Sequence, residues 1–527
     1  MTMIKSLILG SAAGLVALSG AQAADLPVKA KAVEYVRICS LYGAGFFYIP
    51  GTDTCIKLGG YVRVDTTFNG TTYGGPAWNG DQGQGNRYRD YFTSRSRMAL
   101  TVDTRTATEY GVVRTFGQGD FQFDNFGNGT KNPTVLTAAG VNSSLLSGAG
   151  GGYVAVEMVF IQFAGFTFGK SASAYATPWN GYPGNNSSFL IGGPDYVTGV
   201  NNIQYTAQFG NGVSGTIGLD EPTVYNRTIL GNISVGLPAT GTGVPAQAYG
   251  GVHAPDIVGN IRVDQAWGLF QIGGLAHLVN ASYNILTATT AQPNNLSEIS
   301  GHPDDKWGGA VMAALQIKNL PTGAGDDFKI DATYAKGSTK SVISTSGTSP
   351  QFLMFGGSGL GGAYQSVGFG AVTDGVYSGG LGGGATQGIK LTTAYGVRGA
   401  FNHNWDPFWS TSLWGSYAAV RYEGSVGDLT SAKGALCAAY VAATGGLATK
   451  TVDFSCNPDF NVAMVGAVTR WTPVKNLTFS AEVGAFFLDQ KFTGGSILTP
   501  AAPKPTALYE YKDQSTVFLN VRAQRNF

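Results

Sequence analysis

Charged side chains are scarce in this chain of 527 residues. They make up 12% of the sequence, and 33 Lys and Arg residues nearly balance 32 Asp and Glu residues. A typical soluble domain carries about 25% charged residues. The near-zero net charge excludes a chain kept disordered by self-repulsion, and it also excludes a basic nucleic-acid binder.

Long apolar runs are also missing. Beyond position 24 no stretch reaches the roughly 18–20 apolar residues of a spanning helix, and the mean hydropathy is only +0.03. Alternation of apolar and polar residues reconciles low charge with moderate hydropathy, because it gives each strand a lipid face and a wet face. Besides the α-helix, a closed β-barrel is the structure that pairs all backbone N–H and C=O groups within the hydrocarbon core. The sequence therefore predicts an all-β, transmembrane antiparallel β-barrel.

The N-terminus indicates export. Residues 1–23 contain one positive side chain, Lys5, then an apolar run over 7–18 and the small-residue pattern Ala21-Gln22-Ala23. These features are typical of a cleavable signal peptide. A membrane anchor is the alternative, and the shortness of the run argues against it.

Cysteine is rare, with four residues at Cys39, Cys55, Cys437 and Cys456. Four cysteines allow three connectivities. Pairing of sequence neighbours, Cys39 with Cys55 and Cys437 with Cys456, is favoured because each bridge closes a short segment. An oxidising periplasm permits such bridges. No spacing matches a CxxC metal site, so we predict disulfides or unpaired thiols and no metal ligation.

Two-residue periodicity identifies the strands. In 55–65, Leu58, Val62 and Val64 share one face, and the other face carries Lys57, Tyr61, Arg63 and Asp65. A helix would repeat its apolar residues at three and four positions instead. Sixteen segments are predicted as strands, some by clear alternation and others from mixed patterns. They are 55–65, 89–104, 110–117, 153–163, 166–170, 201–209, 213–220, 257–264, 268–279, 307–317, 328–336, 392–403, 408–423, 459–471, 477–491 and 514–527.

Short and long connections alternate between these strands. Seven short links, most of them with turn-forming Gly, Pro, Asn or Asp, alternate with long links such as 221–256 and 337–391. Short periplasmic turns and long external loops are characteristic of outer-membrane barrels. Trp267, Trp405, Trp409 and Trp471 lie at or beside the short links, as expected of an interfacial aromatic girdle.

The sequence gives little support for an enzymatic function. Residues 165–171 (GFTFGKS) place three residues between their glycines, whereas a phosphate-binding loop needs four. His277 has inward parity on its strand, but no serine and orienting partner can be assigned to it. We therefore predict no enzyme, no catalytic residue and no cofactor.

Four runs resemble the alphaproteobacterial (rhizobial-type) porin family. They are 39–63 (CSLYGAGFFYIPGTDTCIKLGGYVR), 160–170 (FIQFAGFTFGK), 255–267 (PDIVGNIRVDQAW) and 471–477 (WTPVKNL). The resemblance implies a trimeric porin of sixteen strands with a third long loop, 171–200, folded into the lumen as a constriction. It also implies passive diffusion of small hydrophilic solutes and ions across the bacterial outer membrane.

Domain limits follow from these segments. They are a signal peptide at 1–23, an N-terminal periplasmic or lumen segment at 24–54, and the barrel at 55–527.

The expected selectivity residues are inward-facing charges. Candidates on the early strands are Lys57, Arg63, Arg95, Arg97 and Arg114, which would make one sector of the wall basic. Asp195 is the acidic residue of the 171–200 loop. Charges facing each other across a narrow wet gap would bias ion passage.

Two function classes are consistent with these features. The first is a general diffusion porin, whose partners are solutes, ions, outer-membrane lipid and two further copies of the chain. The alternative is a substrate-specific channel, or a barrel whose surface loops bind something, as an adhesin or phage receptor does.

Overall fold

The computed structural model describes residues 37–79, 83, 85–87, 89–124, 153–223, 227–237, 243–287, 291–343, 351–378 and 387–527. The expected signal peptide, 1–23, lies outside the described residues, as do residues 24–36. The chain divides into two compact units, 1–56 and 57–527.

The first unit contains a small disulfide-linked hairpin. It includes a 3-10 turn, η1 (Ser40–Tyr42), and β1 (Phe47–Tyr48), which pairs antiparallel with the start of β2 (Thr54–Phe68). Cys39 and Cys55 are bridged with a Cα–Cα distance of 6.1 Å. Both cysteines are buried with Phe46. The predicted first pairing is therefore confirmed.

Sixteen strands form the closed antiparallel barrel of the second unit. Besides β2 they are β3 (Phe92–Thr108), β4 (Gly111–Asp124), β5 (Tyr153–Phe163), β6 (Phe166–Ser171), β7 (Val200–Gly210), β8 (Val213–Asp220), β10 (Asp256–Gln265), β11 (Gly268–Val279), β12 (Lys306–Lys318), β13 (Asp327–Lys336), β18 (Thr393–Asn404), β19 (Trp409–Arg421), β20 (Phe460–Val474), β21 (Leu477–Gln490) and β24 (Gln514–Asn526). Each of the sixteen predicted segments corresponds to one of these strands.

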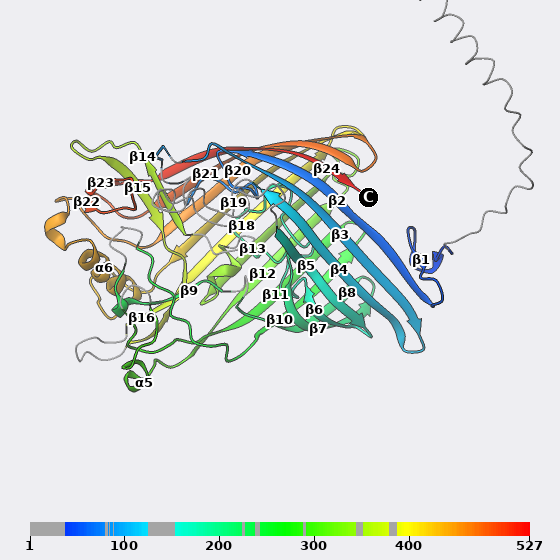
Figure 1. The fold of residues 1–527 in the computed structure, drawn as a ribbon, viewed down its shortest axis with the longest axis horizontal. Helices are drawn as coiled ribbons and strands as arrows, with labels where there is room; N and C mark the ends of the chain where they lie inside the picture. The colour runs from blue at the N-terminus through cyan, green and yellow to red at the C-terminus, as the bar shows by residue number, and fades with distance from the viewer. Residues whose placement is uncertain are drawn as a thin grey trace, which may run out of the picture. The chain divides into compact units, whose positions relative to one another are not determined.

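Successive strands pair around the ring, and the last pairs with the first. The register between β2 and β24 runs from Tyr61 opposite Asn526 to Phe68 opposite Leu519. Figure 1 shows blue β2 beside red β24. This pairing leaves no free edge in the barrel.

Seven short turns connect strands at one end of the barrel. Between β7 and β8, Asn211 and Gly212 both have positive φ, 51° and 72°. Such values favour the type I′ turn, whose twist matches that of a hairpin. The eight connections at the opposite end are long, as predicted.

The two faces of each strand differ as the alternation predicts. Leu58, Val62 and Val64 are exposed on the outer face of β2, and Asp65 is buried toward the lumen. The tryptophans expected near the short turns, Trp267, Trp405, Trp409 and Trp471, are exposed.

One strand prediction was too short. The segment 110–117 was expected to end near its glycines, but β4 continues to Asp124. A Cβ atom at Gly117 or Gly119 would meet open space. The register between β4 and β5 shifts between Gln118 and Gly119, but the pairing continues to Gln122.

The long connections contain secondary structure that was not predicted. One four-stranded sheet contains β14 (Phe352–Gly356), β15 (Gln365–Gly370), β22 (Gly495–Leu498) and β23 (Ala507–Tyr511), and a three-stranded sheet contains β9 (Ile229–Asn232), β16 (Thr373–Ser378) and β17 (Gln387–Leu391). The helical elements are α5 (Ser297–Ser300), α6 (Ala432–Ala443), η2 (Ile233–Val235), η3 (Thr339–Ser341) and η4 (Leu447–Thr449). No helix in the described ranges is long and apolar enough to cross a membrane.

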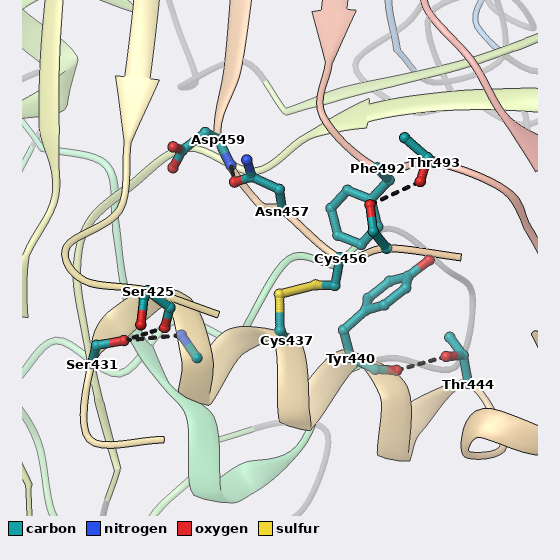
Figure 2. Close-up of a disulfide and its surroundings, with 12 residues drawn as sticks. Ser425, Ser431, Cys437, Tyr440, Thr444, Cys456, Asn457, Asp459, Phe492 and Thr493 are labelled. Atoms are coloured by element: carbon teal, nitrogen blue, oxygen red, sulfur yellow. Dashed lines mark hydrogen bonds between the residues drawn. A yellow bond between two sulfur atoms is a disulfide. The ribbon is translucent and has the colours of Figure 1, made fainter. Parts of the chain in front are cut away.

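Helix α6 carries the second disulfide. Its N-cap residue, Ser431, accepts a hydrogen bond from the Gly434 N–H at 3.1 Å. Cys437 on α6 is bridged to Cys456 with a Cα–Cα distance of 5.8 Å, next to Tyr440 and Phe492 (Figure 2). The second predicted pairing is therefore confirmed.

Candidate functional site in the barrel lumen

The third long loop, L3 (residues 172–199), lies inside the barrel. Inward side chains hold its backbone: Asn260 of β10 donates to the Ala174 carbonyl at 2.6 Å, and Gln271 of β11 donates to the Ala176 carbonyl at 2.7 Å. Leu190 and Ile191 of L3 are fully buried. The inward fold implied by the family resemblance is confirmed.

A buried ion pair anchors the middle of L3. Arg398 of β18 bonds to Asp331 of β13 at 2.9 Å, and both side chains are 0% exposed. The same guanidinium donates to the carbonyls of Leu190 at 3.2 Å and Pro194 at 2.6 Å. Because removal of the arginine would leave a buried carboxylate uncompensated, this anchor resists displacement of the loop.

A second carboxylate holds the L3 backbone from another strand. Glu482 of β21 accepts from the N–H groups of Asn186 at 3.0 Å and Ser187 at 2.8 Å. Arg470 of β20 donates to the Gly184 carbonyl at 2.5 Å. L3 is thus attached to the wall at β10, β11, β18, β20 and β21.

Aromatic side chains fill the lumen beside these attachments. Trp78, from the first long loop L1 (residues 69–91), has its ring centroid 5.7 Å from Phe189 of L3, 5.4 Å from Phe352 of β14 and 4.9 Å from Phe486 of β21. All four side chains belong to one apolar cluster. This half of the lumen is packed like a protein core.

The opposite wall, β2 to β5, carries arginines paired with carboxylates. Asp65 accepts from Arg95 at 2.6 Å and also from Arg522 of β24. Arg63, one position along the inward face of β2, donates to Gln524 at 2.8 Å. Three guanidinium groups therefore lie around Asp65, and even with Asp124 directly opposite Arg95 the cations outnumber the carboxylates, which leaves this cluster positive.

Arg97 belongs to a second cluster, in which Lys170 also lies close to Glu157, with its Nζ donating to the Glu157 carbonyl at 2.7 Å. One of the Arg97 nitrogens lies 2.6 Å from Asp120 and 3.1 Å from Glu157. The ring of Tyr73 in L1 lies over both Arg95 and Arg97, with centroid distances of 4.8 and 5.5 Å. Such contacts fix the orientation of the arginines.

Arg114 belongs to a third cluster, nearer the short turns. It bonds to Asp103 at 3.0 Å, and Arg105 bonds to the same carboxylate at 3.1 Å. The sector expected to be basic also carries acidic residues, because antiparallel pairing places a carboxylate beside each arginine group. The excess positive charge comes from the first and third clusters.

Two of the sequence-predicted residues lie apart from these clusters. Lys57 is exposed and precedes the residues of β2 that pair with β24. Asp195 is buried and accepts from the Tyr182 hydroxyl at 2.7 Å and the Val197 N–H at 3.1 Å. Its carboxylate is thus turned into the packing of L3. The selective roles of Lys57, Arg63, Arg95, Arg97, Arg114 and Asp195 stay predictions.

Sequence reasoning missed a buried polar network at the long-loop end of the lumen. His277 of β11 bonds to Asp256 at 2.6 Å and to the Tyr249 hydroxyl at 3.1 Å, and Tyr249 donates to Asp374 at 2.9 Å. Burial, reinforced by the Asp374 carboxylate, holds the pKa of Tyr249 well above its usual value. Inward parity of His277 was the one sequence signal, because Asp256 comes from the paired strand β10, and Tyr249 and Asp374 come from two long connections.

Lys340 lies buried where L3 meets the sixth long loop, L6 (residues 337–392). Burial lowers the pKa of Lys340 to about 8, although the carboxylates of Asp195 and Asp374 act in the opposite direction. In the described part of the chain, no group of three or more His, Cys, Asp and Glu residues is placed to hold a metal ion.

Comparisons with known proteins agree with this geometry. The family model described as the porin subfamily matches residues 25–520. Porin Omp2b of Brucella suis biovar 1 (strain 1330) is 36% identical over 358 residues, covering 63% of this chain and 84% of the relative. Porin Omp2b of Brucella melitensis biotype 1 is 37% identical over 359 residues, with the same coverage.

A solved structure supports the fold. The outer membrane channel DcaP of Acinetobacter baumannii aligns with a TM-score of 0.53 and 13% sequence identity. The alignment covers 91% of this chain and 99% of that one.

Proposed function

Because this chain belongs to the porin subfamily and is a diffusion channel of the bacterial outer membrane, we propose that solutes cross it between L3 and the charged wall of β2 to β5. Small hydrophilic molecules and ions pass down their concentration gradients. L3 acts as the constriction, and Arg63, Arg95, Arg97 and Arg114 set the field that solutes meet.

One observation carries this proposal: the two halves of the lumen are built differently. L3 is hydrogen-bonded to β10, β11, β18, β20 and β21, and the aromatic cluster fills the space beside it. The β2 to β5 wall instead presents arginine and carboxylate side chains. Arg105 and Arg114 of this wall are 29% and 28% exposed, whereas the Arg398–Asp331 pair of the packed half is 0% exposed, so we place the wet path along this wall.

The clusters also suggest how solutes are selected. Asp65 with three arginines and Asp103 with two are positive, and in the second cluster Arg97 and Lys170 balance the carboxylates of Asp120 and Glu157. Positive and negative groups at neighbouring positions create a field that orients dipolar solutes. The net excess of positive charge favours anions modestly.

Single introduced cysteines test the path. The described residues contain no free cysteine, so a new thiol reacts without competition there. Thr101→Cys, on the inward face of β3, should react with a charged methanethiosulfonate and lower the single-channel conductance. The reagent adds bulk directly to the proposed passage.

Ala418→Cys on β19 is the matched control, because Ala418 is completely buried in the packed half. It should neither react nor change conductance. A reactive Ala418→Cys together with an inert Thr101→Cys would place the path on the other side of L3.

We further propose that three copies assemble. The proposal rests on family membership, since outer-face apolar residues serve lipid and neighbouring subunits equally well. Native mass spectrometry of the detergent-solubilised protein should give three times the chain mass, and a monomer mass would refute it.

A further inference from the structure

An outward-facing basic row lies at the long-loop end of β13, β18 and β19. Lys336 is directly opposite Thr393, and Thr393 is directly opposite Arg421. Neighbouring strands lie about 4.8 Å apart, so the two cations are separated by roughly 10 Å. We call these three residues the basic row.

An apolar groove begins directly below the basic row. It has a volume of about 460 Å³ and is lined by Val311, Ala313, Ala332, Tyr334, Tyr395 and Tyr417, among others. Ala313 and Ala332 face each other across β12 and β13, and their short side chains form the floor. Tyr334, Tyr395 and Tyr417 are exposed and form walls around it.

Strand geometry gives the depth of the basic row in the membrane. Trp409 and Arg421 lie at the two ends of β19, twelve residues apart. At about 3.3 Å per residue and a tilt near 45°, they are separated by roughly 28 Å along the membrane normal. This matches the hydrocarbon thickness of about 30 Å. With Trp409 at the periplasmic interface, Arg421 lies at the headgroups of the outer leaflet.

The positive charge of Arg421 is held in place without an ion pair in the described structure. Its guanidinium donates to the carbonyls of Val420 and Phe460, both at 2.9 Å, and to the side chain of Asn461. It also lies 5.7 Å from the centre of the Tyr395 ring. The nearby Asp489 is already paired with Lys491.

Lys336 adds a second cation to the same row. It is exposed at the end of β13, two positions beyond Tyr334. A phosphate placed between Lys336 and Arg421 would receive charge-assisted bonds from both.

We propose that the basic row and the groove bind one phosphorylated, acylated glycolipid of the outer leaflet, the lipid A part of lipopolysaccharide. Lys336 and Arg421 bind its phosphate, and an acyl chain lies in the groove over Ala313 and Ala332. Charge complementarity favours this occupant, because two cations at headgroup depth beside an apolar groove match a phosphate that carries acyl chains. The site is on the outer face and does not depend on the solute path proposed above.

Lipid binding to the wild-type protein tests the proposal without any substitution. The delipidated oligomer is titrated with bisphosphorylated lipid A and, separately, with dephosphorylated lipid A, and bound lipid is counted by native mass spectrometry. Each basic side chain near an anionic headgroup contributes about fivefold in affinity. The phosphorylated lipid should therefore bind about 30-fold more tightly, and equal binding of the two lipids would overturn the proposal.

Three variants locate the site. Lys336→Ala with Arg421→Ala should remove the preference for the phosphorylated lipid. Ala332→Trp should weaken both lipids, because it fills the groove and leaves the cations. Arg525→Ala removes an exposed cation of β24 at the short-turn end of the barrel, far from the basic row, and should change the affinity for neither lipid.

The alternative occupants give different results. If the double alanine variant binds both lipids as the wild type does, the basic row is not the site. If it dissociates the oligomer while lipid binding is unchanged, the face is an interface between copies, and the proposal is wrong.

Discussion

The two halves of the lumen use inward-facing residues in opposite ways. On β18 to β21, Arg398 and Glu482 bind the backbone of L3, and Phe486 packs into an aromatic cluster. On β2 to β5, Arg95, Arg97 and Arg114 stay in the wall and pair with carboxylates of their own or neighbouring strands. The barrel is thus narrowed by filling one half, while the other half keeps a polar surface.

Breaking the anchor of L3 should have the largest effect. Arg398→Met leaves Asp331 buried without its cation, which should lower the free energy of unfolding by about 3–5 kcal/mol. Urea unfolding in detergent, followed by tryptophan fluorescence, measures this loss. In planar bilayers, the released loop should make the conductance larger and noisier.

Arg105→Met is the control for that substitution. Arg105 pairs with Asp103 at a partly exposed position, so the cost should stay below about 1 kcal/mol. Equal losses for the two variants would show that L3 does not depend on its anchor.

Loosening the aromatic cluster should cost less. Phe486 is fully buried, with its ring centroid 5.4 Å from that of Phe352. Phe486→Leu should lower the free energy of unfolding by roughly 1–3 kcal/mol, because the smaller side chain leaves a cavity. Phe479→Leu on the outer face of the same strand should change it by less than about 0.5 kcal/mol.

Removing charge from the polar half should change the ion selectivity of the channel and leave the stability of the packed half unchanged. Arg95→Ala with Arg97→Ala should move the reversal potential by several millivolts in the direction of greater cation permeability, because the excess of positive charge on this wall is then lost. Measurement under a salt gradient gives the shift. The charge-conserving variant with lysine at both positions should retain most of the wild-type potential, and an unchanged potential in the alanine variant would remove both arginines from the path.

The smallest effect on the channel is expected from the second disulfide. Cys437→Ser with Cys456→Ser alters a connection outside the barrel strands, so conductance and the unfolding midpoint of the barrel should stay at wild-type values. Limited proteolysis should nevertheless cut residues 422–459 faster, because the bridge no longer restrains α6. A lowered barrel midpoint would show that this loop supports the wall.

The barrel could be predicted from sequence because its pattern is local. Alternation in residues such as Leu58, Val62 and Val64 fixes the outer face of one strand without reference to any other. Turn residues such as Asn211-Gly212 mark where the chain reverses. The same reasoning placed all sixteen strands, although it ended β4 seven residues early at Gly117.

The lumen could be predicted only in part, because its contacts join distant segments. Parity placed Arg95 and Arg97 inside, but strand register decides that Asp65 and Asp120 are beside them. Trp78 lies in a loop without periodicity, and the sequence around it does not predict that it packs against Phe352 and Phe486. The inward position of L3 came from family resemblance alone.

The anchor at Arg398 has a consequence for regulation. A loop whose carbonyls are bound by a fully buried guanidinium has no second position of similar energy. The anchor therefore favours a single cross-section, and any signal that changed it would first have to break these buried contacts. A cell that needs a leakier or tighter envelope would have to adjust how many copies it makes.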